Sequence, residues 1–397
     1  MVDPNKLRAY LAHRQGLLEF STKTNREVLK DHGWARSVGG HNIYITLFSR
    51  NQCRKAKAEE DAKNMEIYEF ASARGCTHFL PKDDFQTGIK AGQGFNDASA
   101  IRTAKNKLGF TDENLAELKS GILSALENGA LDTTGIKKVL GDLVMNFGEA
   151  GKKIGQTTSL SLGLLSLQAE GKIRRVPPEW RLEAQTYSYQ LFDNGPDVGD
   201  SYSKEEAYAD LAKMYWNWVG VANLGHFQWF SGLGVGASKA ATADIGLVPL
   251  DGTDLLIRED DIDDFRNFEA PSQPVYRLIT NLDGLFLHRR DLQALIAPED
   301  KNREVPTEKG KGGLLTAQDL NNHAIIDRGR LIGLWEYEVG TQSLAYATFV
   351  PMTAALEAEI KRTEAYIRDE LGDCRCFSLD SPKSRQAVID SIRAMAK

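Results

Sequence analysis

Residues 157–189, TTSLSLGLLSLQAEGKIRRVPPEWRLEAQTYSY, decide the fold of this chain. Apolar residues recur with the 3.6-residue period of a helix, and a glycine, a residue type that often ends helices, follows at position 171. Residues 172–176 then alternate charged and apolar side chains, two prolines interrupt this pattern, and a second alternating segment returns over 181–189. The pattern predicts a helix followed by a β-hairpin that carries cations. This combination is typical of a winged helix-turn-helix, a fold that commonly binds duplex DNA.

The charge is unevenly distributed. The 397 residues carry a formal net charge of -6, so total charge does not indicate a nucleic-acid partner. Residues 1–57 nevertheless hold eleven basic and four acidic side chains, and residues 151–181 hold six basic and two acidic ones. Residues 251–270 hold two basic and eight acidic ones. Two segments could therefore attract phosphate, although a solvated charged surface is the alternative. The acidic segment 259–264 is expected to be a solvated loop between domains.

Metal, cofactor and membrane motifs are missing from the sequence. The four cysteines, Cys53, Cys76, Cys374 and Cys376, include no C-x-x-C pair, and the seven histidines form no H-E-x-x-H motif. We expect no metal, no cofactor and no disulfide framework, and hence a cytoplasmic protein. No apolar run approaches 18 residues, so no membrane segment is expected.

Helices and strands are expected in an order that repeats three times and then changes. The fold class is α+β, with three tandem winged helices over residues 1–105, 106–198 and 199–270 and a β-rich C-terminal domain over 271–397. The C-terminal domain is expected to be a small barrel or curled sheet closed by helices. The expected helices cover residues 6–20, 25–32, 114–127, 132–140, 203–218, 224–231, 237–245 and 352–371. The expected strands cover residues 43–48, 77–81, 246–250, 275–279, 285–288, 324–326, 331–339 and 343–350, and residues 301–313 are expected to be a mobile loop.

Two other patterns permit alternative interpretations. Gly232, Gly234 and Gly236 could form a phosphate loop before a helix, but no strand precedes them, so a turn between two helices is favoured. An aromatic cluster over residues 215–230 could stack on bases, but its helical spacing favours packing in a core.

Candidate DNA contacts are the cations of the hairpin and of two other segments. Strand alternation is expected to point the hairpin cations to one exposed side, where they would reach phosphates or a minor groove. Arg36 and Arg50 flank a glycine-containing loop, and for them phosphate contact and plain surface charge are both open. The full set is Arg36, Arg50, Lys152, Lys153, Lys172, Arg174, Arg175 and Arg181.

The sequence resembles the winged-helix DNA glycosylases of the AlkZ and YcaQ type over nearly its whole length. The similar stretches are QGL at 15–17, GWARS at 33–37, LFSR at 47–50, EFASARG at 69–75, FQWFSGL at 227–233 and DRGRLIGLW at 327–335. The resemblance implies three tandem winged helices around a concave DNA-binding face, with a C-terminal β-barrel. It also implies double-stranded DNA as partner, and removal of alkylated bases by hydrolysis of the N-glycosidic bond. We expect a monomer.

The chain departs from that family at its catalytic motif. The family carries Gln-x-Gln or Gln-x-Asp just after the second helix, and the matching positions here hold Arg36 and Val38. An amide or carboxylate oxygen can position water and stabilise an oxocarbenium-like sugar. A guanidinium only donates hydrogen bonds and repels a developing cation, and valine offers no polar atom. Either another residue supplies the catalytic group, or the scaffold binds DNA without cutting glycosidic bonds. The candidates for that group are Gln15, Glu19, Asp31 and Gln185.

A protein-interaction module that reuses winged helices is a third possibility. The sequence leaves these alternatives open.

Overall fold

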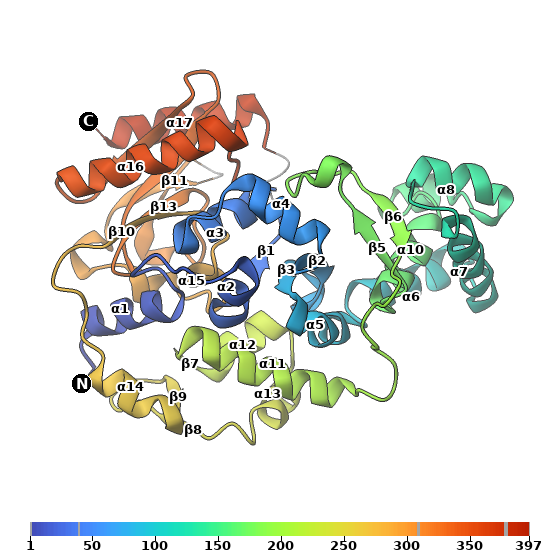
Figure 1. Ribbon diagram of the computed structural model, residues 1–397, viewed down its shortest axis with the longest axis horizontal. Helices are drawn as coiled ribbons and strands as arrows, with labels where there is room; N and C mark the ends of the chain where they lie inside the picture. Colours follow the sequence, from blue (N-terminus) through green and yellow to red (C-terminus); the bar gives the residue numbers. More distant parts are fainter. Residues whose placement is uncertain (1, 39, 308–309, 377–379, 397) are drawn as a thin grey trace. The chain divides into compact units, whose positions relative to one another are not determined.

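The computed structural model describes residues 2–38, 40–307, 310–376 and 380–396 (Figure 1). The chain forms two compact units. Unit 1 comprises Met1–Tyr68, Phe79–Lys82 and Ala209–Lys397, and unit 2 comprises Glu69–His78 and Asp83–Tyr208. Helices and several small sheets build both units, so the fold class is mixed α and β.

One arrangement of elements occurs three times along the chain. Each copy has the order helix, strand, helix, helix, strand, strand, apart from short inserted helices. In each copy the last strand lies between the other two, which gives the sheets β1-β3-β2, β4-β6-β5 and β7-β9-β8. The helices-then-hairpin order expected from the sequence is present in the second and third copies, and each copy has one further short strand.

The first copy follows helix α1 (Pro4–Arg14), and one of its elements differs from the type expected from the sequence. Residues 43–48, expected to be a strand, lie in a helix in which every residue from Asn42 to Arg50 is buried. Because this helix has no solvent face, its apolar residues show no 3.6-residue period, and its β-branched residues imitate a strand. The copy consists of α2 (Asn25–His32), β1 (Ala35–Arg36), α3 (Asn42–Asn51), α4 (Lys55–Lys63), β2 (Ile67–Ala71) and β3 (Thr77–Pro81).

The second copy lies in unit 2 and contains residues 157–189. It follows α5 (Phe85–Gly92) and α6 (Asn96–Leu108), and consists of α7 (Asp112–Leu126), β4 (Leu131–Asp132), α8 (Thr133–Leu140), α9 (Gly148–Lys152), α10 (Leu160–Ala169), β5 (Ile173–Val176) and β6 (Ser188–Leu191). Thr111 caps α7 through a capping box, which fixes where the helix begins. Leu118 and Ile122 of α7 pack with Leu164 and Leu167 of α10 in one buried core. The predicted helix and first strand are confirmed, whereas the second strand begins only at Ser188.

In the third copy, the glycines that were expected to form a turn between two helices do so. It consists of α11 (Lys204–Val219), β7 (Val221–Ala222), α12 (Leu224–Ser231), α13 (Val235–Ala241), β8 (Leu247–Pro249) and β9 (Leu256–Arg258). Gly232 ends α12 with a left-handed φ of 78° and leads into α13, so these glycines form a turn between helices. Tyr215, Trp216 and Phe227 are fully buried, so core packing is the correct interpretation of these aromatic residues.

The C-terminal part of unit 1 is a four-stranded sheet with helices against it (Figure 1). Strands β10 (Tyr276–Ile279), β13 (His323–Asp327), β14 (Arg330–Glu338) and β15 (Ser343–Thr348) pair in that order. Helix α16 (Ala354–Tyr366) packs against β10, and α17 (Pro382–Met395) packs against β14 and β15. In the described residues β10 and β15 are sheet edges, which corresponds to an open sheet and not to a closed barrel.

Two smaller expectations were wrong, and a third was wrong in part. Residues 285–288 lie in helix α15 (Gly284–Leu287) and its C-cap, not in a strand. Residues 301–313 contain strands β11 (Glu304–Thr307) and β12 (Gly310–Gly313), while 308–309 lie outside the described residues. The acidic segment is not a loop but a 3-10 turn (Glu259–Asp261) and the start of α14 (Ile262–Asn267). Asp261 is buried and bound by Arg258 at 2.7 and 2.9 Å, whereas the other four carboxylates are exposed, as expected. In the described part of the chain, no helix has both the length and the apolar character needed to cross a bilayer.

Candidate nucleic-acid interface

The hairpin β5–β6 sends its two central arginines to opposite faces. Arg174 pairs with Gln190 and Arg175 with Tyr189 in the strand register. Adjacent residues in a strand point to opposite sides, so the expectation that all hairpin cations share one exposed side was wrong. Arg174 lies on the side of Lys172, which is exposed, and its guanidinium carbon is 6.0 Å from the ring centre of Trp180. Lys172 and Arg174 are therefore the hairpin cations that share this side.

Arg175 takes part in a contact within unit 2. Its guanidinium forms an ion pair with Glu69 at 2.7 Å and lies 4.6 Å from the ring centre of Tyr187. Burial, assisted by the charge of Glu69, raises the pKa of Tyr187 to about 12, so its hydroxyl stays protonated at neutral pH. Arg175 therefore anchors the hairpin to the segment 69–78, and no sequence pattern pointed to Glu69 as its partner.

The other expected cations of unit 2 lie at its surface. Arg181 forms an ion pair with Glu183 at 2.8 Å, with 53% of the arginine side chain exposed. Lys152 forms one with Glu149 at 2.6 Å, and Lys153 is exposed beside it. The Lys152–Glu149 pair is exposed on both sides and contributes little to stability, so a phosphate could replace its carboxylate at small cost. The Glu183 side chain is only 8% exposed, so Arg181 would leave a buried carboxylate behind if it turned to a phosphate.

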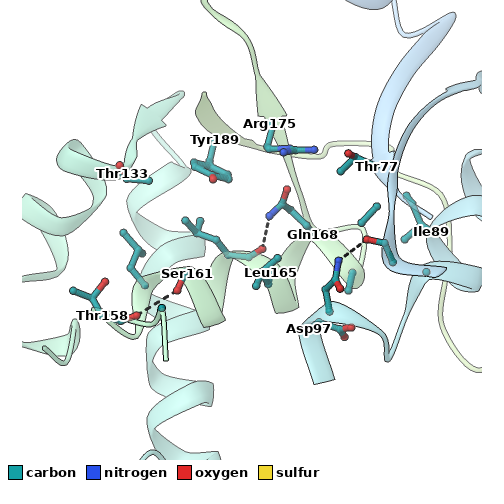
Figure 2. Close-up of a pocket in the computed structure, with 18 of the residues that line it drawn as sticks. Thr77, Ile89, Asp97, Thr133, Thr158, Ser161, Leu165, Gln168, Arg175 and Tyr189 are labelled. Atoms are coloured by element: carbon teal, nitrogen blue, oxygen red, sulfur yellow. Dashed lines mark hydrogen bonds between the residues drawn. The ribbon is translucent and has the colours of Figure 1, made fainter. Parts of the chain in front are cut away.

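The outer face of α10 borders a half-open pocket, and Ser161 on this face is exposed. The pocket encloses about 490 Å³ and lies entirely within unit 2. Ser161, Leu165 and Gln168 of α10 form one wall, and the opposite wall comes from residues 71–77 and from helices α5 and α6. In Figure 2 the Gln168 side chain lies between the hairpin residues Arg175 and Tyr189 and the α6 residue Asp97.

Helix α10 was expected to insert its exposed face into a DNA groove, and this pocket bears on that expectation. A major groove is about 12 Å wide and accepts a whole helix. The space beside α10 is instead of the size that small ligands occupy, and the helix itself carries no lysine or arginine. The expectation that the exposed face of this helix enters a groove therefore does not fit the structure. The side of the hairpin that carries Lys172 and Arg174 is the better candidate for a DNA contact.

The two positions that match the family's catalytic motif follow one another in the first copy. Arg36 ends β1, and its backbone carbonyl accepts a hydrogen bond from Asn42 Nδ2 at 2.6 Å. Val38 lies just beyond and is half-buried. The asparagine at the start of α3 thus holds the backbone of this segment in place.

The other catalytic candidates are not gathered in one place. Gln15 is 3% exposed and donates from Nε2 to the carbonyl of Trp218 at 2.8 Å. Asp31 lies at the surface in an ion pair with Lys23 at 2.6 Å, and Glu19 is exposed. Gln185, in unit 2, is exposed in the segment before β6. Gln15 is separated from solvent, so a substrate would reach it only after local opening.

Arg50 lies in the interior of unit 1 and not at its surface. Its side chain is 3% exposed and binds both carboxylate oxygens of Asp283, at 2.8 and 2.9 Å. It also donates from Nε to the carbonyl of Gln15 at 2.8 Å and from Nη1 to that of Thr46 at 3.1 Å. Phosphate contact by Arg50 is therefore incorrect for this structure, because its donors are used and water does not reach them.

Asp283 and His288 complete this buried group, and sequence reasoning missed both. Burial alone would raise the pKa of Asp283, but the charge and hydrogen bonds of Arg50 outweigh burial and hold that pKa below its usual value. Burial lowers the pKa of His288 to about 4, so the imidazole is neutral at pH 7. Gly33 lies against this ring, and a Cβ at its position would be 2.1 Å from His288 Cε1.

Known proteins show the family and the fold. A family model described as DNA glycosylase AlkZ-like matches residues 35–375. The DNA glycosylase AlkZ of Streptomyces sahachiroi has a similar structure, with a TM-score of 0.68 and 16% sequence identity over 94% of this chain and 98% of that chain. At this identity the structural likeness shows the fold alone. A comparison with curated proteins found no match.

The family match covers most of the chain and agrees with the resemblance seen in the sequence. This chain belongs to the AlkZ-like DNA glycosylase family.

Proposed function

We propose that this protein binds double-stranded DNA through three winged helices on a DNA glycosylase scaffold, and that it recognises or excises alkylated bases. The observation that carries the proposal is the threefold arrangement of helix, strand, helix, helix and hairpin with its constant strand order. It occurs in a chain of a DNA glycosylase family. We also propose the division at residues 105, 198 and 270, a monomeric state and a cytoplasmic location.

Charge indicates which winged helix meets the phosphates. Residues 1–105 carry seventeen basic and twelve acidic side chains, residues 106–198 carry ten and twelve, and residues 199–270 carry five and thirteen. The third segment would repel a polyanion. Phosphate contacts are therefore expected from the first winged helix and from the Lys172–Arg174 side of the second. Exposed pairs in the first, such as Arg26–Glu66 at 3.0 Å, can exchange for phosphate at low cost.

Excision is the sharper form of the proposal, and it requires a catalytic oxygen. An N7-alkylated purine carries a positive charge, so the base leaves without a strong acid, and the protein must position water and stabilise the sugar cation. Arg36 and Val38 cannot do this through their side chains. If the protein is an enzyme, an amide or carboxylate outside these two positions acts on an extruded nucleotide.

A non-catalytic DNA-binding or regulatory protein is the competing proposal. The substitution of both catalytic positions favours it, and it needs only the cations.

Two measurements test these proposals in order. Fluorescence anisotropy with a labelled duplex at several salt concentrations tests DNA binding, and neutralising about six phosphates should give a log-log slope of about -5. An affinity that does not depend on salt, or no binding at low salt, would refute DNA binding. Incubation with duplex containing N7-methylguanine or another alkylated base, followed by hot alkali, tests excision. Strand scission supports the enzyme, and intact strands with every lesion support the non-catalytic protein.

A further inference from the structure

Four side chains that can bind a metal meet beside the C-terminal sheet, within unit 1. His323 begins β13, Glu336 lies on β14, and Cys374 and Cys376 follow the helical segment that ends at Leu371. Ligand atoms of His323, Glu336 and Cys376 all lie within 4.8 Å of one another. Cys374 Sγ lies 3.6 Å from His323 Nε2 and so approaches the same group from its histidine side.

This group is closed off from water. His323 and Cys374 are 0% exposed, Cys376 is 3% exposed and Glu336 is 4% exposed. Glu336 Oε1 accepts hydrogen bonds from Asn322 Nδ2 at 3.0 Å and from Cys376 Sγ at 2.9 Å. A buried carboxylate is costly unless a cation or strong hydrogen bonds compensate its charge, and both of these donors are uncharged.

We propose that His323, Glu336 and Cys376, with Cys374 as the fourth ligand, bind one zinc ion. Thiolate, imidazole and carboxylate are the ligand types that zinc accepts, and four protein ligands with tetrahedral geometry are typical of structural zinc sites. With zinc–sulfur and zinc–nitrogen bonds of about 2.3 and 2.0–2.1 Å, tetrahedral geometry separates nitrogen from sulfur by about 3.6 Å. The distance from His323 Nε2 to Cys374 Sγ equals this value.

Two adjustments complete the site. Zinc replaces the proton between Cys376 Sγ and Glu336 Oε1, and these atoms move apart by about 0.7 Å to reach the separation of two zinc ligands. Cys374 Sγ lies outside the 4.8 Å group of the other three ligand atoms, so its side chain rotates toward Glu336 and Cys376 while keeping its distance of 3.6 Å from His323 Nε2. Both cysteines bind as thiolates, so zinc binding releases their protons to solvent.

Arg385 of α17 lies beside this group, where its hydrogen bonds hold the backbone of one ligand and its charge can balance the site. Its Nη2 donates to the carbonyl of Cys374 at 3.2 Å and to that of Tyr337 at 2.7 Å, and its Nη1 donates to Asp373 at 2.9 Å. Two thiolates and one carboxylate around a divalent ion leave one net negative charge, which the nearby guanidinium balances. The zinc would hold the sheet to the segment that leads into α17. The C-x-C sequence alone indicated no zinc site because its second pair of ligands comes from distant strands.

The test is the metal content of the full-length protein. After gel filtration in metal-free buffer, elemental analysis should find about one zinc per chain in the wild type. The variants C376S, C374S and E336Q should each lose at least nine-tenths of it. C53S and C76S are matched controls, because these cysteines lie elsewhere in the chain, and they should keep the metal.

A second measurement uses the wild type and does not depend on whether the variants fold. Cobalt added to the metal-free protein should give the strong near-ultraviolet absorption of cobalt–thiolate bonds and the visible bands of a tetrahedral ion, and zinc should abolish both. Removal of the metal with a strong chelator should lower the melting temperature, and zinc should restore it. Metal content below one-tenth per chain in the wild type together with no thiolate absorption on cobalt addition would overturn the proposal. Metal content in C376S equal to that of the wild type would also overturn it.

Discussion

Arg50 and Asp283 provide the sharpest test of how this scaffold is held together. The two side chains are 3% and 0% exposed and share two hydrogen bonds of 2.8 and 2.9 Å. Replacement of Arg50 by methionine keeps much of the volume but leaves a buried, uncompensated carboxylate. Removing one partner of a buried ion pair typically costs about 3–5 kcal/mol. A typical domain is stable by only about 5–15 kcal/mol, so R50M should lose a large part of its folding free energy.

The partner variant and a double-mutant cycle separate the ion pair from other contacts. D283N should cost less than R50M, because the arginine also binds the carbonyls of Gln15 and Thr46 and keeps these acceptors. The double variant R50M/D283N should be less destabilised than the sum of the two single variants, by about 1–3 kcal/mol.

Urea unfolding followed by tryptophan fluorescence measures the change in the free energy of unfolding, and it reports mainly on unit 1. Five of the six tryptophans lie in unit 1, as do Arg50 and Asp283. The matched control is the surface pair Lys23–Asp31, with side chains 51% and 36% exposed, where K23A should cost under about 1 kcal/mol.

The result has a direct consequence for function. If R50M keeps the unfolding midpoint of the wild type but loses affinity for duplex DNA, Arg50 contacts phosphate and the argument from burial is wrong. If R50M is destabilised and its folded fraction binds DNA normally, the arginine is structural.

Three further predictions concern the hairpin and the His288 region. K172A/R174A should weaken duplex binding in anisotropy and reduce the salt slope by about 2. R175A should change neither quantity and should instead lower the melting temperature, because the ion pair with Glu69 is lost. Equal effects of the two variants on binding would contradict the conclusion that Arg174 and Arg175 lie on opposite faces of the hairpin. Burial lowers the pKa of His288 to about 4, so the folded state holds this imidazole neutral. Its contribution to the free energy of unfolding is complete above pH 6.5 and decreases by up to about 3 kcal/mol as pH falls toward 4. Urea midpoints that are equal at pH 7.5 and 4.5 would contradict this. G33A should cost about 2–4 kcal/mol in urea unfolding, because φ is +104° and the new Cβ would be 2.1 Å from His288 Cε1; a wild-type midpoint would show that the ring moves freely.

Local sequence patterns predicted the helices that have one solvent-exposed face, and also strands rich in β-forming residues, including β13 and β14, which are buried on both faces. Helix α7 has its capping box, and β13–β15 have alternating or strongly β-forming residues bounded by turns. Two segments that were expected to be strands, residues 43–48 and 285–288, are short apolar segments of buried helices. Burial on every side removes the polar positions that would reveal the period, so the type of element was set by packing partners and not by local sequence.

The candidate site was less predictable because it depends on contacts between distant residues. Arg50 and Asp283 are 233 positions apart, and nothing near either residue indicates an ion pair. The cationic character of the hairpin was evident from its sequence, but only the paired register showed that Arg174 and Arg175 point to opposite faces. Net charge locates a cationic segment, whereas side-chain direction decides which of its members can meet a phosphate.

The substitution at the family's catalytic positions has opposite effects on binding and on chemistry. A guanidinium at position 36 adds positive charge to residues 1–105, a segment with more basic than acidic side chains, and so favours contact with a polyanion. The same charge raises the energy of a sugar that is becoming a cation, and valine at position 38 adds no oxygen to offset it. A change that aids binding and opposes bond cleavage would be strongly selected against in an enzyme that uses these positions. DNA binding by this protein can therefore stand even if excision fails, and excision requires an oxygen from a residue that the family's motif does not include.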